Sequence, residues 1–138
     1  MNQKLIVEFP KSISVSIKRE DLIHPFVSGN KFRKLKYNLL KAKEKNFGTL
    51  LTFGGAFSNH IAAVAYAGKE NGFRTIGIIR GDELRDQIAE NPTLIFAQNC
   101  GMEFKFVSRE EYRLKKETSF VDNLKKEFGN FYLIPEGG

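Results

Sequence analysis

Two lysines at the start of a predicted helix are the first residues whose types and spacing suggest chemistry. Lys31 and Lys34 lie three positions apart in SGNKFRKLKY (28–37), so both share one helix face. Backbone N–H groups at a helix N-terminus favour anions. A lysine among cations has a lowered amine pKa, which makes the amine a better nucleophile toward a carbonyl. The spacing allows a site in which Lys31 forms an imine and Lys34 meets a phosphate; the alternative is a pair of ordinary surface lysines.

A second group of polar residues lies in GGAFSNH (54–60), between a predicted buried strand and a predicted helix. The two glycines let the backbone approach a ligand closely. Ser58 can cap the helix and, with the free N–H groups beside it, hold a carboxylate. Asn59 can hydrogen-bond a phenolic oxygen or a carbonyl, and His60 can carry a proton. The alternatives are a plain helix cap, a turn residue and a half-buried helix residue, respectively.

The elements that must position these residues follow a repeating pattern. A helix is predicted over 30–45, with Asn30 as its cap and with Asn46 and Gly48 at its end. Apolar runs predict strands at 49–55, 73–81, 103–107 and 131–135, and helices are expected at 58–72, 91–99 and 109–128. Strands that alternate with helices indicate an α/β fold with an open parallel sheet of about four strands. In such sheets ligands bind at the carboxyl ends of the strands.

The N-terminal segment has a different pattern. Residues 5–9 and 12–18 are short and rich in β-branched side chains, and Pro10-Lys11 between them is typical of a turn. Ile13, Val15 and Ile17 alternate with serines, which predicts a half-buried strand. We therefore expect an N-terminal β-hairpin before the α/β part.

Composition narrows the class of protein. The chain has 138 residues, of which 41% are hydrophobic and 28% are charged, and these values argue against a disordered chain. No apolar run approaches the length of a membrane span, and the N-terminus lacks the pattern of a signal peptide. One cysteine and two histidines argue against a transition-metal site. A reducing cytoplasm is the expected compartment, and no membrane partner is expected.

The net charge of +6 is concentrated in the predicted helix. Residues 31–45 hold seven lysines and arginines against one glutamate, which equals the whole excess. Such a cluster suits an anionic partner. It also leaves open a different function, in which a basic α/β module binds nucleic acid or an acidic partner, and a solvated helix face remains the simplest alternative.

Four motifs taken together resemble the N-terminal half of a known enzyme family. They are KREDL (18–22), GNKFRKL (29–35), GGAFSNH (54–60) and PEGG (135–138), and the resemblance runs along essentially the whole chain. The family is that of 1-aminocyclopropane-1-carboxylate deaminase and D-cysteine desulfhydrase. Its members are pyridoxal-phosphate enzymes of the tryptophan-synthase β-subunit fold type (fold type II), with two domains and a site between them.

The resemblance implies a role for each matching residue. Lys31 matches the catalytic lysine that forms the Schiff base with pyridoxal 5′-phosphate, and Lys34 matches the basic residue near the cofactor phosphate. Asn59 matches the asparagine that hydrogen-bonds the cofactor's 3′-oxygen. Ser58 matches a catalytic residue that contacts the substrate carboxylate, and His60 joins Ser58 and Asn59 in the expected substrate-binding set.

The resemblance also implies an activity: conversion of a small amino acid to ammonia and a 2-oxo acid, with no nucleic-acid partner. The expected organisation is a hairpin and lysine segment over 1–35, followed by a small α/β domain over 36–138. The family's C-terminal half, which carries the glycine-rich phosphate loop and further substrate residues, has no counterpart in the sequence, so we expect the chain alone to be inactive. Ala62 stands where many relatives carry arginine. The partners that we expect are a small amino-acid substrate and further copies of the chain in a homo-oligomer.

Overall fold

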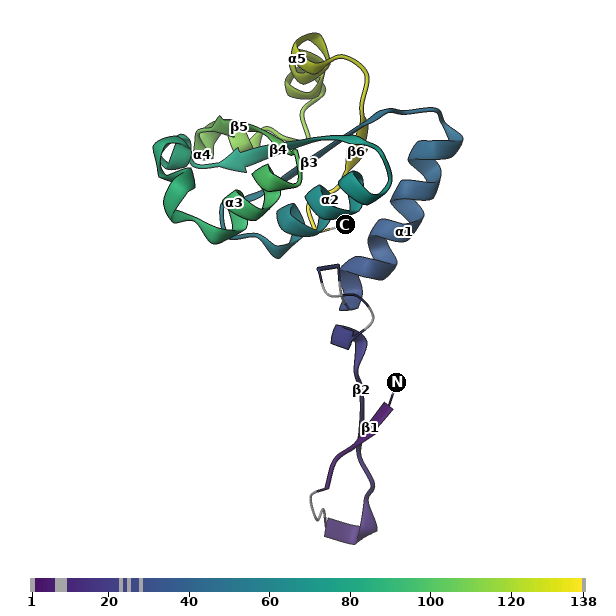
Figure 1. Cartoon of the computed structure of the whole chain (residues 1–138). Coiled ribbons are helices and arrows are strands. Elements are labelled where there is room, and N and C mark those ends of the chain that lie inside the picture. The colour runs from purple at the N-terminus through teal and green to yellow at the C-terminus, as the bar shows by residue number, and fades with distance from the viewer. Residues whose placement is uncertain (1, 7–9, 23, 25, 28, 138) are drawn as a thin grey trace.

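A four-stranded parallel sheet forms the centre of the protein (Figure 1). The structure is a computed structural model that describes residues 2–6, 10–22, 24, 26, 27 and 29–137. The strand order is β5 (Glu103–Val107), β4 (Arg74–Arg80), β3 (Thr49–Gly55) and β6 (Tyr132–Ile134). All neighbouring pairs are parallel, and β3 lies in the middle with nearly every residue buried. The predicted fold class and all four predicted strands are therefore confirmed.

Helices cover both faces of this sheet and give the protein two hydrophobic cores. On one face, α1 (Gly29–Glu44), α2 (Asn59–Glu70) and α3 (Pro92–Asn99) pack around Leu50 and Ile79. On the other face, α4 (Arg109–Arg113) and α5 (Thr118–Phe128) cover Leu51 and Ile78. Neighbouring residues of a strand thus enter opposite cores, as the alternation of side chains along a strand requires. None of the helices that the structure describes is long and apolar enough to cross a membrane.

The helix ends follow local sequence signals, with three differences from prediction. The predicted helix over 91–99 is confirmed, because Asn91 accepts a hydrogen bond from the Leu94 N–H at 3.1 Å and Pro92 occupies the first turn. Asn30 lies inside α1 rather than capping it, because the helix begins at Gly29. The predicted helix over 109–128 is two helices, and a 3₁₀ segment, η3 (Asp82–Glu90), follows β4 without having been predicted.

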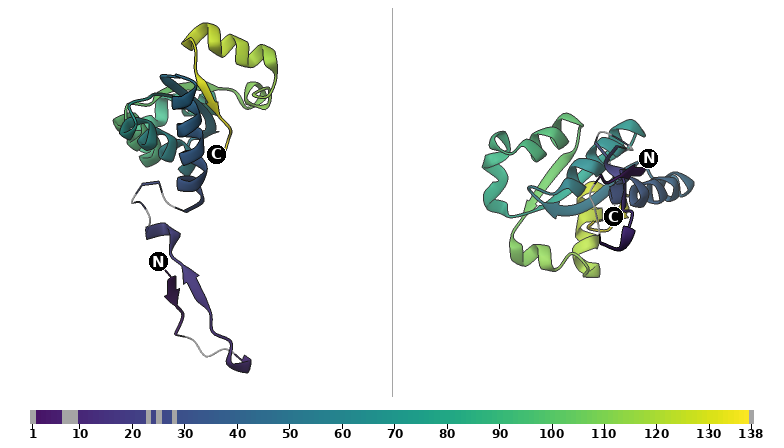
Figure 2. Two further views of the ribbon diagram at one scale, coloured as in Figure 1. Left: turned by 90° about the vertical axis from the view of Figure 1, so that its right-hand side faces the viewer. Right: turned by 90° about the horizontal axis from the view of Figure 1, so that it is seen from below.

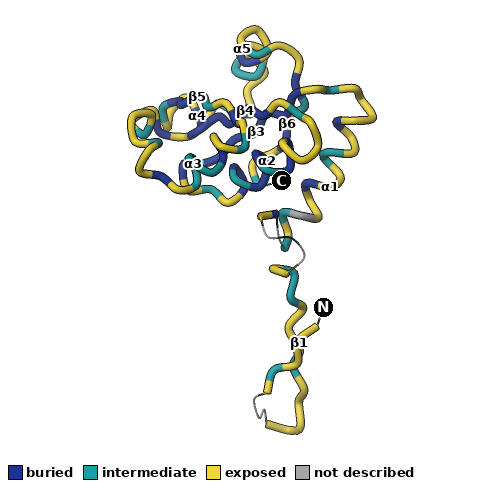
Figure 3. The backbone as a smooth tube through the Cα atoms, viewed as in Figure 1, coloured by how far each residue is buried: buried dark blue, intermediate teal, exposed yellow. Residues whose placement is uncertain are grey.

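The N-terminal hairpin projects away from the body of the protein (Figures 1 and 2). Its strands β1 (Asn2–Lys4) and β2 (Ser16–Lys18) are antiparallel, so the predicted hairpin is present. The position of its first strand is wrong, because β1 precedes the predicted range 5–9, and β2 covers only the end of the predicted range 12–18. A 3₁₀ turn, η1 (Pro10–Ser12), lies at the predicted turn, and residues 7–9 of the first predicted strand lie outside the described residues. The predicted half-burial is wrong, because Ile13 is 56% exposed in an arm that extends away from both cores (Figure 3).

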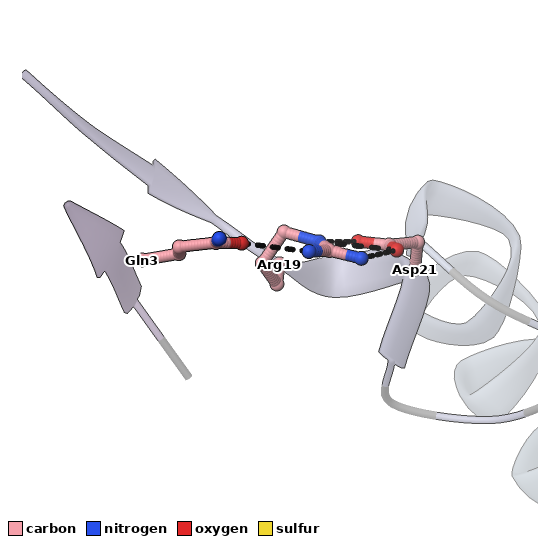
Figure 4. Close-up of polar contacts among 3 residues, drawn as sticks. All are labelled: Gln3, Arg19 and Asp21. Atoms are coloured by element: carbon pink, nitrogen blue, oxygen red, sulfur yellow. Dashed lines mark hydrogen bonds and ion pairs between the residues drawn. The ribbon is translucent and has the colours of Figure 1, made fainter. Parts of the chain in front are cut away.

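A polar clamp joins this arm to the segment that leads into α1. The Arg19 guanidinium donates to both carboxylate oxygens of Asp21, with its Nε 2.8 Å from Oδ1, and to Gln3 Oε1 at 2.7 Å (Figure 4). Asp21 belongs to the 3₁₀ turn η2 (Glu20–Leu22), so the KREDL motif fixes the base of the hairpin. The α1 helix continues without a break across the domain boundary predicted between residues 35 and 36, and the domain division stays a prediction.

Candidate active site

The head of α1 meets the segment that follows β6. The Lys31 ammonium donates a hydrogen bond to the Gly137 carbonyl oxygen at 2.8 Å, and the Lys34 ammonium donates to the same oxygen at 3.4 Å. Because β6 pairs with β3, Gly137 lies at the carboxyl edge of the sheet. Gly137 has a φ of +84°, a conformation that glycine adopts without strain. The two lysines therefore share one helix face, as their spacing predicts, and they converge on the sheet edge.

The surroundings of Lys31 favour its neutral amine. Partial burial lowers the pKa of Lys31, and the positive charge of Lys34 lowers it further. A lowered pKa leaves a larger fraction of the amine unprotonated near neutral pH, and only the unprotonated amine attacks a carbonyl. The head of α1 thus places the more nucleophilic amine of Lys31 beside a second cation, Lys34, and both donate to the carbonyl oxygen of Gly137.

The GGAFSNH segment forms the turn between β3 and α2 at this same edge. The Ser58 hydroxyl oxygen caps α2 by accepting a hydrogen bond from the His60 N–H at 3.2 Å, and Asn59 is exposed in the first turn. Gly54 has a packing role, because a Cβ atom there would lie 2.6 Å from the Ile61 side chain. A glycine at this position therefore lets α2 approach the end of β3, which sets the position of Ser58 and Asn59.

His60 points into the core rather than toward the sheet edge. His60 as a whole residue is 3% exposed, and its Nε2 lies 2.8 Å from the Thr52 hydroxyl oxygen. That hydroxyl donates its proton to the Ile134 carbonyl at 2.9 Å, so the hydrogen-bond network assigns the proton of the imidazole to Nε2. His60 Nδ1 is buried without a partner among the described residues.

This environment keeps His60 neutral. Burial, followed by the charge of Lys31, lowers the pKa of His60 to about 4. A neutral imidazole that joins β3 to β6 and α2 stabilises the frame on which the other site residues lie. The expected contact of His60 with substrate stays a prediction, and its burial favours the alternative of a packed helix residue.

An open cleft of about 530 Å³ lies at the carboxyl edge, in front of the first turn of α2. Among its lining residues are Gly55, Ser58, Arg80 and Glu136. Glu136 precedes Gly137, the residue bound by Lys31, so the segment after β6 connects the head of α1 with the cleft that contains Ser58. The structure thus brings Lys31, Lys34, Ser58 and the segment after β6 to one end of the sheet.

Sequence reasoning missed two residues of this region. Arg80 was treated as part of a strand, although its position at the carboxyl end of that strand was a usable signal. Thr52 is a polar residue inside an otherwise apolar run, and this pattern is a weak indication of a buried hydrogen bond.

A separate apolar hollow of about 380 Å³ between α1 and α2 contains none of the predicted site residues. Over the part of the chain that the structure describes, no group of three or more histidine, cysteine, aspartate or glutamate side chains is arranged to hold a metal ion.

Comparison with known proteins shows what the chain is similar to. It is 36% identical over 140 residues to a putative 1-aminocyclopropane-1-carboxylate deaminase of Thermotoga maritima. This alignment covers 96% of the chain and 44% of the relative. The chain is homologous to the N-terminal part of proteins in the 1-aminocyclopropane-1-carboxylate deaminase and D-cysteine desulfhydrase family. No protein-family profile matches the chain.

A second relative and a crystal structure agree with this family. The mitochondrial bifunctional D-cysteine desulfhydrase/1-aminocyclopropane-1-carboxylate deaminase of Arabidopsis thaliana is 31% identical over 137 residues, which are 94% of the chain and 34% of that protein. The crystal structure of a homologue of 1-aminocyclopropane-1-carboxylate deaminase superposes with a TM-score of 0.75 at 30% identity, over 100% of the chain and 42% of the homologue. The chain thus spans less than half the length of the family proteins that it matches.

Proposed function

We propose that the chain forms one wall of the active site of a pyridoxal-phosphate-dependent deaminase or lyase. The substrate would be a small amino acid of the 1-aminocyclopropane-1-carboxylate or D-cysteine type, and the products would be ammonia and a 2-oxo acid. The observation that carries the proposal is the hydrogen bond from Lys31 to Gly137. It holds Lys31, whose pKa is lowered by partial burial and by the charge of Lys34, at the end of the sheet where α2 begins.

The residues present fit the chemistry of pyridoxal phosphate. Lys31 offers a nucleophilic amine for the aldehyde, and Lys34 offers an ammonium group for the phosphate. Asn59 presents an exposed amide in the first turn of α2, where it would hydrogen-bond the ring oxygen. When bound, the cofactor supplies an electron sink for the bond-breaking step.

The chain's own groups would divide the remaining work. Lys31 would hold or release a proton at Nζ, and its lowered pKa suits this exchange near neutral pH. The Ser58 hydroxyl oxygen accepts a hydrogen bond from the His60 N–H, so the hydroxyl proton of Ser58 stays available for a carboxylate oxygen. The buried hydrogen bonds from His60 to Thr52 and from Thr52 to the Ile134 carbonyl join α2, β3 and β6, the elements that lead into the site.

The proposal is tested by trapping the cofactor on the 138-residue chain. The chain is incubated with pyridoxal phosphate, reduced with borohydride and digested, and the labelled lysine is identified by mass. We expect the label at Lys31, with loss of this peptide signal in Lys31→Ala. The matched control is Lys36→Ala, because Lys36 is an exposed lysine of the same helix and its removal should leave Lys31 labelling unchanged.

Two outcomes would contradict the proposal. One is label spread over exposed lysines such as Lys36 and Lys41, and the other is a labelling pattern that Lys31→Ala does not alter.

The proposal also includes a cytoplasmic location. The Arabidopsis relative is named as a mitochondrial protein, so relatives of the chain also occur in another compartment.

A further inference from the structure

Arg80 holds a position in the cleft that the proposed function does not yet use. It is the last residue of β4, next to β3 in the sheet, and its side chain lines the same cleft as Ser58. The guanidinium reaches across the neighbouring strand end, since a Cβ atom built at Gly55 would lie 3.7 Å from Arg80 Nη2. A side chain at Gly55 would therefore begin in van der Waals contact with the guanidinium.

The other charges that line the cleft are already paired. Glu83 pairs with Arg109 at 3.1 Å, and Glu136 pairs with Lys115 at 3.0 Å. Arg80 has no ion pair with any carboxylate that the structure describes. Arg80 is therefore the cation of the cleft that lacks a close ion pair, although the charge of Glu136, which is paired with Lys115, also acts on it.

The Arg80 guanidinium makes a cation–π contact with an aromatic ring. Its central carbon lies 5.7 Å from the ring centroid of Tyr112, which is 3% exposed and belongs to α4. A cation over a buried ring is held in place, so less side-chain entropy is lost when a ligand binds. Lys115 Nζ also lies over this ring, 4.3 Å from its centroid, so two cations share Tyr112. The Arg80 backbone is fixed at the end of β4 rather than in a loop.

We propose that Arg80 is a specificity-determining residue that binds the carboxylate of the amino-acid substrate together with the Ser58 hydroxyl. This inference rests on the proposed function. A planar guanidinium binds a carboxylate through two parallel hydrogen bonds, and a single positive charge matches a monoanion better than a phosphate dianion. In the proposed function the phosphate is bound by Lys34 at the head of α1, so Arg80 is left for the carboxylate. Arg80 would therefore make the site select amino acids with a free carboxylate.

The test measures binding of D-alanine and D-alaninamide to the ¹⁵N-labelled chain without cofactor, by NMR titration. D-alaninamide lacks the carboxylate and is otherwise closely similar. We expect D-alanine to shift the Ser58 and Arg80 signals and to bind at least about 10-fold more tightly than the amide. Arg80→Gln should remove this preference, and Arg80→Lys should restore part of it. The control Arg85→Gln, an exposed arginine outside the cleft, should keep the full preference.

Three results would overturn the inference: equal binding of the acid and the amide, an unchanged preference in Arg80→Gln, or no binding of D-alanine to the wild-type chain up to high concentration. Inorganic phosphate is titrated in parallel, and tighter Arg80-dependent binding of phosphate than of D-alanine would also overturn it. The same titration in Lys36→Ala, at an exposed lysine of α1 that does not line the cleft, should give the wild-type preference. If pyridoxal phosphate is not trapped at Lys31 but the chain still prefers D-alanine to the amide, the proposed function is rejected while carboxylate binding at Arg80 is retained.

Discussion

The buried histidine gives the protein a pH-dependent stability that can be calculated. In the folded chain burial and the nearby Lys31 lower the pKa of His60 from 6.5 to about 4. Between these two values the unfolded chain binds a proton that the folded chain does not, so stability is lost as the pH falls through this window. Between pH 7 and pH 5 the loss amounts to about 2 kcal/mol.

The assay is urea denaturation followed by circular dichroism at pH 7, 6 and 5, for the wild type and for His60→Gln. Glutamine keeps an N–H donor for Thr52 but does not titrate. We expect the wild type to lose about 2 kcal/mol more than the variant between pH 7 and pH 5. The carboxylates titrate in both proteins, so their contribution cancels in this difference. The reasoning is refuted if the wild type and His60→Gln lose the same stability between pH 7 and pH 5, within about 0.5 kcal/mol.

Two substitutions test the packing that positions the α2 turn and its neighbour α3. Gly54→Ala places a Cβ against Ile61 and should lower the free energy of unfolding, measured by urea denaturation, by about 1–3 kcal/mol. The control Gly48→Ala should change this free energy little, because no atom lies within 4 Å of the added Cβ. Equal effects of the two variants would contradict the close approach of α2 to β3. Asn91→Ala removes the cap of α3 and the hydrogen bond to the Ala56 carbonyl at 3.0 Å, and a loss of about 1–3 kcal/mol is expected against almost none for the exposed Asn99→Ala. Similar midpoints for the two asparagine variants would show that the buried cap is not needed.

The sheet was predictable because each of its strands carries a local signal. Runs such as TLLTFGG are apolar at consecutive positions, as a strand buried on both faces requires, and β3 is such a strand. The hairpin shows the limit of this reasoning. The alternation of Ile13, Val15 and Ile17 with serines predicts one apolar face, but burial of that face needs a partner surface, and the strand pattern does not contain one.

The candidate site was predictable where its residues lie close together in sequence. Lys31 and Lys34 share a helix face, and Ser58 caps the next helix, so short-range spacing was enough. The contact of Lys31 with Gly137 joins residues 106 positions apart and depends on the pairing of β6 with β3. Arg80 was missed for a related reason. It lacks a close ion pair because the charged residues near it pair with other partners, and only the fold decides which charges lie close enough to pair.

The central claim is that Lys31 and Lys34 bind the two ends of one cofactor. Its most direct test is the extent of borohydride-trapped label at Lys31 with pyridoxal phosphate, compared with pyridoxal, which lacks the phosphate. We expect the phosphate to raise Lys31 labelling at limiting reagent by about 10-fold, and Lys34→Gln to bring the two reagents close to equality. Equal labelling of Lys31 by both reagents in the wild-type chain would contradict the claim.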